Sequence, residues 1–141
     1  MSLKAILLKR QEQYYKDRMG MFTQQWRIIQ ADHNVNTQKH LQKNNPEFID
    51  WEITCLFYAA VQLVNEYLRH RGLKIPMTHK ERNPLVKKLL AEIYPDFWKL
   101  YSISLQTRYT SSFNTFNENN RNAVKTWFSN INTKVRQAIT P

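Results

Sequence analysis

The chain has few of the residues that tight turns and cofactor loops require. Its 141 residues include two glycines, which excludes a Gly-rich phosphate loop and a dinucleotide-binding fingerprint. Cys55 is the single cysteine, so the chain can form neither an internal disulfide nor a cysteine-based zinc site. No apolar run approaches the roughly 20 residues that span a bilayer. We therefore expect a cytoplasmic protein that has no membrane partner.

Acidic residues are also scarce, with 11 Asp and Glu against 21 Lys and Arg, which gives a net charge of +10. Residues 69–88 hold seven basic residues and one acid, more than half of this excess. Such a segment is either a solvated surface or a patch that contacts phosphates. In the second interpretation the nucleic-acid-binding residues are Arg69, Arg71, Lys74, Lys80, Lys87 and Lys88, and the rings of Tyr109 and Trp127 could stack on bases.

Helical periodicity covers most of the chain and predicts an all-α, single-domain, up-and-down bundle of four to five main helices over 21–141. Residues 1–20 are expected to form an N-terminal helical arm. The expected helices are 4–18, 21–43, 47–70, 79–94, 96–113 and 122–139. Asn44-Asn45-Pro46 separates the second from the third, Gly72 is the expected C-terminal cap of the third, and Thr78 caps the fourth.

Residues 47–70 form the most strongly amphipathic segment and should be the central helix. Two apolar stripes lie side by side on it: Ile49, Ile53, Leu56, Ala60, Leu63 and Tyr67, and Phe57, Val61, Val64 and Leu68. The aromatic rings predicted for the core are Trp26, Phe57, Phe97 and Phe128. Cys55 lies inside the central helix and is interpreted as a small core residue.

The second helix carries a stripe of Phe22, Trp26 and Ile29 that becomes polar at His33, Asn36 and His40. His33 and His40 are seven residues apart and would need a third metal ligand from elsewhere, and an HExxH motif is absent. We interpret them as polar surface or hydrogen-bonded histidines. No metal or cofactor is expected.

His79 and Arg82 are three residues apart, so one helical turn presents an imidazole and a guanidinium to the same space. This pair suits a phosphodiester, because the imidazole can move a proton while the guanidinium binds the charged oxygens. The alternative is a pair of solvated side chains. Arg108 shares a helix face with Tyr101 and Ser104. It should be at least partly buried, either in a salt bridge with Glu52 or Glu66 or in a cleft near His79.

Several of these residues resemble a bacterial HEPN-type helical domain over roughly residues 26–112. The resemblance rests on Trp51-Glu52-Ile53-Thr54 followed by Phe57-Tyr58-Ala59-Ala60-Val61, on His79-x-x-Arg82, on Arg108-Tyr109, and on Ala31-Asp32-His33-Asn34. It implies a four- or five-helix bundle, often a homodimer, from a defence, toxin–antitoxin or RNA-processing system. The two apolar flanks of helix 47–70 add to the expectation of a homodimer.

Active HEPN domains are metal-independent ribonucleases in which four to six residues separate an arginine from a following histidine. This chain departs from that pattern, since His79 precedes Arg82 and seven residues separate Arg71 from His79. The similar subgroup often has a histidine where Gln62 stands, and an amide cannot act as a general base. Inactive members bind nucleic acid or protein, or act as partners of a nucleotidyltransferase.

Three functions follow as hypotheses. The first is a HEPN-like protein that binds nucleic acid, RNA rather than DNA, through residues 69–88. The second is a metal-independent endoribonuclease with His79, Arg82 and Arg108 as catalytic residues. The third is a dimeric interaction module whose basic face meets an acidic antitoxin, a nucleotidyltransferase or another protein.

Overall fold

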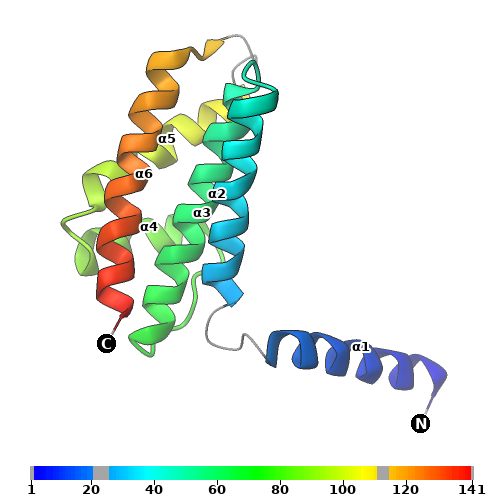
Figure 1. Cartoon of the computed structure of the whole chain (residues 1–141). Helices are drawn as coiled ribbons and strands as arrows, with labels where there is room; N and C mark the ends of the chain where they lie inside the picture. The colour runs from blue at the N-terminus through cyan, green and yellow to red at the C-terminus, as the bar shows by residue number, and fades with distance from the viewer. Residues whose placement is uncertain (1, 21–25, 111–114, 141) are drawn as a thin grey trace.

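The computed structural model describes residues 2–20, 26–110 and 115–140, with the backbone alone for 12–20. The described elements are α1 (Leu3–Gly20), α2 (Trp26–Asn44), α3 (Ile49–His70), α4 (His79–Leu89), α5 (Tyr94–Leu105), the π-helical turn η1 (Gln106–Thr110) and α6 (Glu118–Ile139) (Figure 1). The described ranges contain no strand, so the predicted all-α bundle is confirmed. Phe22 and residues 111–113 of the expected helices lie outside the described residues. In the described ranges, no helix has the length and apolar character needed to cross a bilayer.

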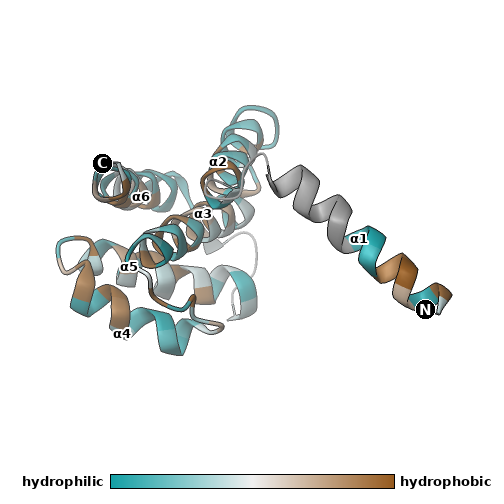
Figure 2. Ribbon diagram, turned by 90° about the horizontal axis from the view of Figure 1, so that it is seen from below, coloured by the Kyte–Doolittle hydropathy of each residue, from teal (hydrophilic) through white to brown (hydrophobic). Residues whose placement is uncertain are grey.

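Helix α3 lies at the centre of the bundle and packs against α2, α5 and α6. The short turn over residues 45–48 returns the chain, so that α2 and α3 run side by side in opposite directions (Figure 1). Helix α1 projects away from the bundle in the same view. Helix α4 lies at the edge, next to α5 (Figure 2).

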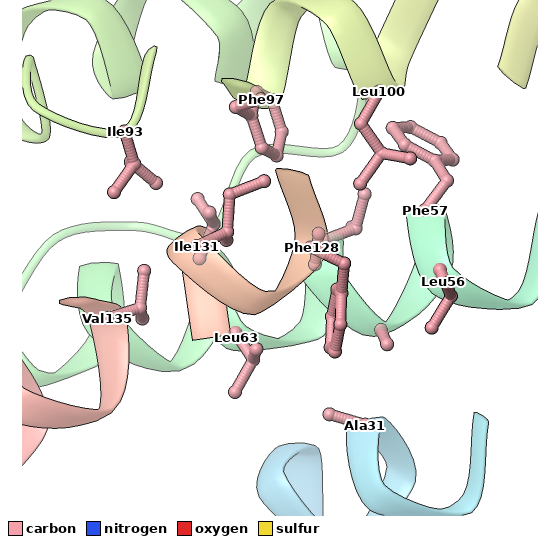
Figure 3. Packing of buried hydrophobic residues seen from close by; sticks show 14 of the residues in the cluster. Ala31, Leu56, Phe57, Leu63, Ile93, Phe97, Leu100, Phe128, Ile131 and Val135 are labelled. Carbon is pink, nitrogen blue, oxygen red and sulfur yellow. The ribbon is translucent and has the colours of Figure 1, made fainter. Parts of the chain in front are cut away.

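Both predicted stripes of α3 are buried, because α3 has helices on several sides. In Figure 3, Leu56 and Leu63 face Phe128 of α6, while Phe57 lies beneath Leu100 of α5. The core positions of Phe57, Phe97 and Phe128 are confirmed. Since one chain covers both stripes, neither stripe is left for a second copy. The homodimer stays a prediction that rests on the family resemblance.

The stripe predicted for α2 is wrong. Ile29 is 43% exposed, and His33 and His40 are exposed on the same face. The buried residues of α2 are Ala31 and Gln38, with Ile28 and Val35 packed beside them. Trp26 is half-buried outside the core, and the Arg27 guanidinium lies 4.4 Å from its ring centre.

Helix α4 ends at Leu89 rather than at Tyr94, because Leu90 leaves the helical conformation with φ −129° and ψ 50°. A new helix, α5, begins at Tyr94 with Pro95 in its first turn, where a missing N–H costs nothing. The predicted caps are confirmed. Thr78 accepts a hydrogen bond from the Glu81 N–H, and Gly72 has φ 73° in a Schellman turn closed by Leu73 N–H to Leu68 C=O.

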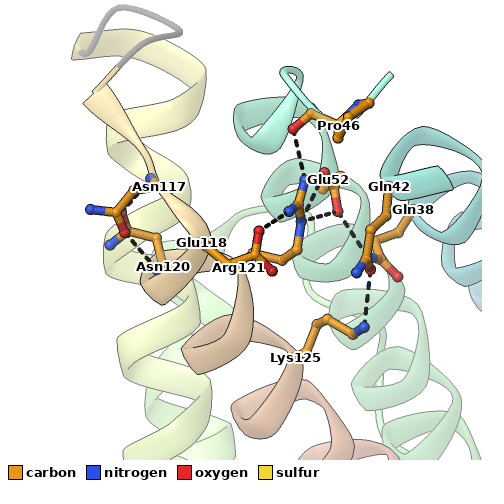
Figure 4. A network of polar contacts seen from close by, with 9 residues as sticks. All are labelled: Gln38, Gln42, Pro46, Glu52, Asn117, Glu118, Asn120, Arg121 and Lys125. Carbon is orange, nitrogen blue, oxygen red and sulfur yellow. Dashed lines mark hydrogen bonds and ion pairs between the residues drawn. The ribbon is translucent and has the colours of Figure 1, made fainter. Parts of the chain in front are cut away.

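A buried ion pair that the sequence analysis did not predict joins three helices (Figure 4). Glu52 of α3 and Arg121 of α6 are 1% and 5% exposed, and their shortest contact is 2.6 Å. Gln38 of α2 donates to the second oxygen of Glu52, and Arg121 donates to the Pro46 carbonyl and to Glu118. The hydrogen bond to Glu52 raises the pKa of Arg121 further above its usual range. This network fixes the ends of α2, α3 and α6 relative to one another.

Candidate nucleic-acid interface

The first turn of α4 places His79 and Arg82 in direct contact. Arg82 is 5% exposed, and its guanidinium is held on three sides. Its Nε donates to Asn65 Oδ1 at 2.9 Å, its Nη1 to His79 Nδ1 at 2.9 Å, and its Nη2 to the Pro76 carbonyl at 3.0 Å. Arg82 is therefore a buried side chain rather than a solvated one.

The contact with Arg82 fixes the protonation of His79. A guanidinium has only donors, so His79 Nδ1 must accept and a neutral ring carries its proton on Nε2. Burial lowers the pKa of His79 below its ordinary value, and the charges of Arg82 and Arg108 lower it further. At neutral pH, His79 is therefore an uncharged ring with an Nε2–H donor.

Arg108 lies close to this pair, on the π-helical turn that follows α5. Turns of this kind are frequent at functional sites. Its Nε donates to the Ser104 carbonyl and its Nη2 to Ser104 Oγ, both at 3.2 Å. Its Nη1 donates to the hydroxyls of Tyr58 at 3.4 Å and Tyr109 at 3.2 Å. The prediction that Arg108 is at least partly buried is confirmed, whereas the predicted salt bridge to Glu52 or Glu66 is wrong, since Arg108 binds the Ser104 carbonyl instead.

The two acids proposed as partners of Arg108 are used elsewhere. Glu52 pairs with Arg121. Glu66 is fully buried and pairs with Arg69 at 2.5 Å and with Arg27 at 3.6 Å. Within the described residues, the acceptors of Arg82 and Arg108 are neutral atoms, and no carboxylate binds either guanidinium.

Phe57 contacts two of the three predicted catalytic residues, and the third, Arg82, is hydrogen-bonded to His79. The ring centre of Phe57 lies 5.2 Å from that of His79 and 4.9 Å from the guanidinium carbon of Arg108. Tyr101 contacts both Phe57 and His79, at 6.0 and 5.6 Å between ring centres. The structure therefore brings His79, Arg82 and Arg108 together around one aromatic cluster.

The basic segment 69–88 divides into buried or paired residues and exposed ones. Arg82 belongs to the interior, and Arg69 is half-buried against Glu66. The exposed basic residues are Arg71, Lys74, Lys80, Lys87 and Lys88. Lys80, Lys87 and Lys88 share the outer face of α4, because residues seven and eight apart lie on one side of a helix. We call these five residues the basic surface.

The remaining candidates are dispersed. Tyr109 is 72% exposed beside Arg108, whereas Trp127 lies half-buried on α6 with Lys99 above its ring. His40 contacts Asn44, and no group of three His, Cys, Asp or Glu residues in the described ranges could hold a metal ion. Cys55 is half-buried, and burial together with Glu52 raises its thiol pKa.

Sequence reasoning missed the residues that hold the site. Asn65 and the Pro76 carbonyl bind Arg82, and Tyr58 contacts Arg108. The available signal was the polar Asn65, which directly follows Val64 on the apolar central helix, since a buried amide needs a partner. On the same side of α3, Gln62 Oε1 is buried without a hydrogen-bond partner.

Comparison of the chain with protein-family models, with curated proteins and with solved structures gave no match. The assignment to HEPN-type domains therefore stays a prediction from the residues quoted above.

Proposed function

We propose that this protein binds RNA through phosphate contacts at the basic surface and at the adjoining His79–Arg108 site. One observation carries the proposal: two guanidiniums flank a neutral imidazole, and all their acceptors are uncharged. Arg108 is half-buried and binds no carboxylate among the described residues, so its charge can attract an anion. A phosphate oxygen can take the long bonds from Arg108 that two tyrosine hydroxyls now accept.

The basic surface extends this site along α4 and the loop before it. Its five cations and Arg108 can each neutralise one phosphate, which gives six contacts at most. A single strand then loses affinity with salt at a log–log slope no steeper than about −4. RNA is proposed over DNA because of the resemblance to HEPN-type domains.

The second candidate function is a metal-independent ribonuclease, and the convergence of His79, Arg82 and Arg108 favours it. Binding ranks first because of the His79 tautomer. A general base needs a lone pair at the atom that faces the substrate, but Arg82 occupies Nδ1 and the proton occupies Nε2. As arranged here, His79 donates a hydrogen bond to a phosphate.

The test is a fluorescence-anisotropy titration of labelled single-stranded RNA at several salt concentrations, with EDTA present. The patch variant carries Lys87→Gln and Lys88→Gln. The matched control carries Lys39→Gln and Lys43→Gln, which remove the same charge from two exposed positions of α2. We expect the patch variant to make the slope shallower by about 1.4, and the control to leave it close to that of the wild type.

RNA that remains unbound at low salt would overturn the proposal and turn attention to an acidic protein partner. Equal losses in the patch and control variants would assign the binding to net charge rather than to the basic surface. Cleavage that persists in EDTA and disappears in His79→Ala would establish the ribonuclease instead. The same titration with DNA of the same sequence tests the preference for RNA.

A further inference from the structure

A pocket of about 360 Å³ opens between the first turns of α3 and the turn η1. This size falls within the roughly 300–1,000 Å³ of small-molecule sites. The side chains that line it are Trp51, Thr54, Tyr58, Thr107, Arg108 and Tyr109. A hydrogen bond of 2.9 Å between the hydroxyls of Thr54 and Thr107 ties its two walls together.

The aromatic side chains of this pocket are unusually accessible. Trp51 is 60% exposed, Tyr109 is 72% exposed and Tyr58 is 39% exposed. The interior already holds Phe57 and Phe97 as its packed rings, so these three are available for contact with a ligand. Exposed aromatic rings that gather around one hollow mark a binding site more often than a structural need.

Arg108 adds a cation to these rings. Its guanidinium carbon lies 4.9 Å from the ring centre of Tyr109 and 5.6 Å from that of Tyr58. A guanidinium in this position favours planar π-systems by stacking and anions by charge. Arg108 also belongs to the phosphate site with His79, so the aromatic pocket and that site share one residue.

We propose that the pocket binds one unpaired nucleobase of a single-stranded nucleic acid, stacked on Tyr109 and Trp51. This inference rests on the proposed function, since the phosphates of the same strand lie on the basic surface. Arg108 then contacts the base with its face and the neighbouring phosphate with its N–H groups. Bases in a duplex are already stacked, so single strands are the substrate class.

The experiment measures three ligands of equal length and charge per strand: a single-stranded RNA, its duplex, and an abasic strand that carries the phosphates alone. The variants are Tyr109→Ala, Trp51→Ala and the conservative Tyr109→Phe, which keeps the ring but loses the hydroxyl. Trp98→Ala is the matched control, because Trp98 is 46% exposed and does not line the pocket. All three substituted positions are exposed, so we expect the fold to be retained in circular dichroism.

Each alanine variant should bind the single strand about 5- to 150-fold more weakly than the wild type, which is the range of base–aromatic stacking. Tyr109→Phe keeps the stacking ring and should lose far less affinity than Tyr109→Ala, whereas Trp98→Ala should bind the single strand as the wild type does. The abasic strand should bind every variant equally, and the duplex should lose little in the alanine variants.

The two proposals fail in different ways. Absence of binding to every ligand at low salt would overturn the proposed function. Equal binding of the base-containing and abasic strands, with no effect of Tyr109→Ala, would overturn the pocket assignment and leave phosphate binding in place. A loss in Trp98→Ala as large as in Tyr109→Ala would also refute the pocket as the base site.

Discussion

The substitution Arg82→Met tests how the His79 site is held together. Methionine keeps much of the aliphatic volume of the arginine side chain and removes the guanidinium. Two buried acceptors, Asn65 Oδ1 and the Pro76 carbonyl, then lose their donor. An unsatisfied buried group costs about 1–3 kcal/mol, so the free energy of unfolding should fall by about 2–6 kcal/mol.

The lower part of this range is expected, because the variant no longer buries a charge. Burial opposes the charged form of Arg82 and lowers its pKa, while Glu81 beside it favours that form. We therefore expect a loss of about 2–3 kcal/mol, a large fraction of the roughly 5–15 kcal/mol that stabilises a small domain. Urea unfolding followed by circular dichroism measures it. Lys87→Met, at an exposed position of the same helix, should change the stability by no more than about 0.5 kcal/mol.

The same variant has a second consequence, for His79. Burial and Arg108 still lower the pKa of its imidazole, but the charge of Arg82 is gone and Nδ1 is free to bind a proton. The pKa of His79 should rise, as observed by NMR titration of its ring protons. A stability loss below about 1 kcal/mol, or an unchanged His79 pKa, would refute the buried three-sided arrangement of Arg82.

Other predictions concern the ion pair, the pH dependence and the assembly. Either Glu52→Gln or Arg121→Met alone should lower the free energy of unfolding by about 3–5 kcal/mol. The double variant Glu52→Leu with Arg121→Met should recover most of that loss. Equal losses in the single and double variants would count against the pair. His79 has a lowered pKa in the folded state, so its unfolded form binds a proton first as the pH falls. The contribution of neutral His79 to the free energy of unfolding is therefore fully present above pH 6.5, the ordinary pKa of histidine. It is lost as the pH falls from there towards the pKa of the folded state. Urea unfolding of His79→Gln should show a smaller decrease over this range. Light scattering tests the homodimer, which a mass of 17.0 kDa at all concentrations would exclude.

Apolar periodicity predicts the buried residues correctly for those helices whose buried face is also their apolar face. On α3 and α6 these faces coincide, so Leu63 and Phe128 are buried as predicted. On α2 they differ, because Ala31 and Gln38 face the core while Ile29 faces solvent. A small side chain lets helices approach closely, and an amide can be buried when a carboxylate accepts its hydrogen bond. A hydropathy pattern records neither property.

The buried ion pair shows a related limit. Glu52 interrupts a run of apolar residues on the central helix, and a buried carboxylate there requires a cation. The sequence contains several arginines, and the helical pattern of residues 96–113 favours Arg108. The partner is Arg121, 69 positions away, because α6 rather than η1 packs over that side of α3. Local spacing can show that a partner is needed, but tertiary packing decides which residue supplies it.

At the candidate site, too, sequence spacing predicts one contact and tertiary packing decides its chemical consequence. The three-residue spacing of His79 and Arg82 correctly predicted that their side chains meet. The consequence of that meeting depends on Asn65 and Pro76, which lie on other segments and hold the remaining two sides of the guanidinium. A guanidinium fixed on three sides cannot turn away from the imidazole, so Nδ1 stays an acceptor and Nε2 stays a donor. On a solvated helix, the same histidine and arginine would leave both tautomers of the imidazole accessible, and the histidine could then act as a general base. The proposal of binding rather than catalysis therefore rests on the burial of Arg82, which the spacing of its neighbours does not reveal.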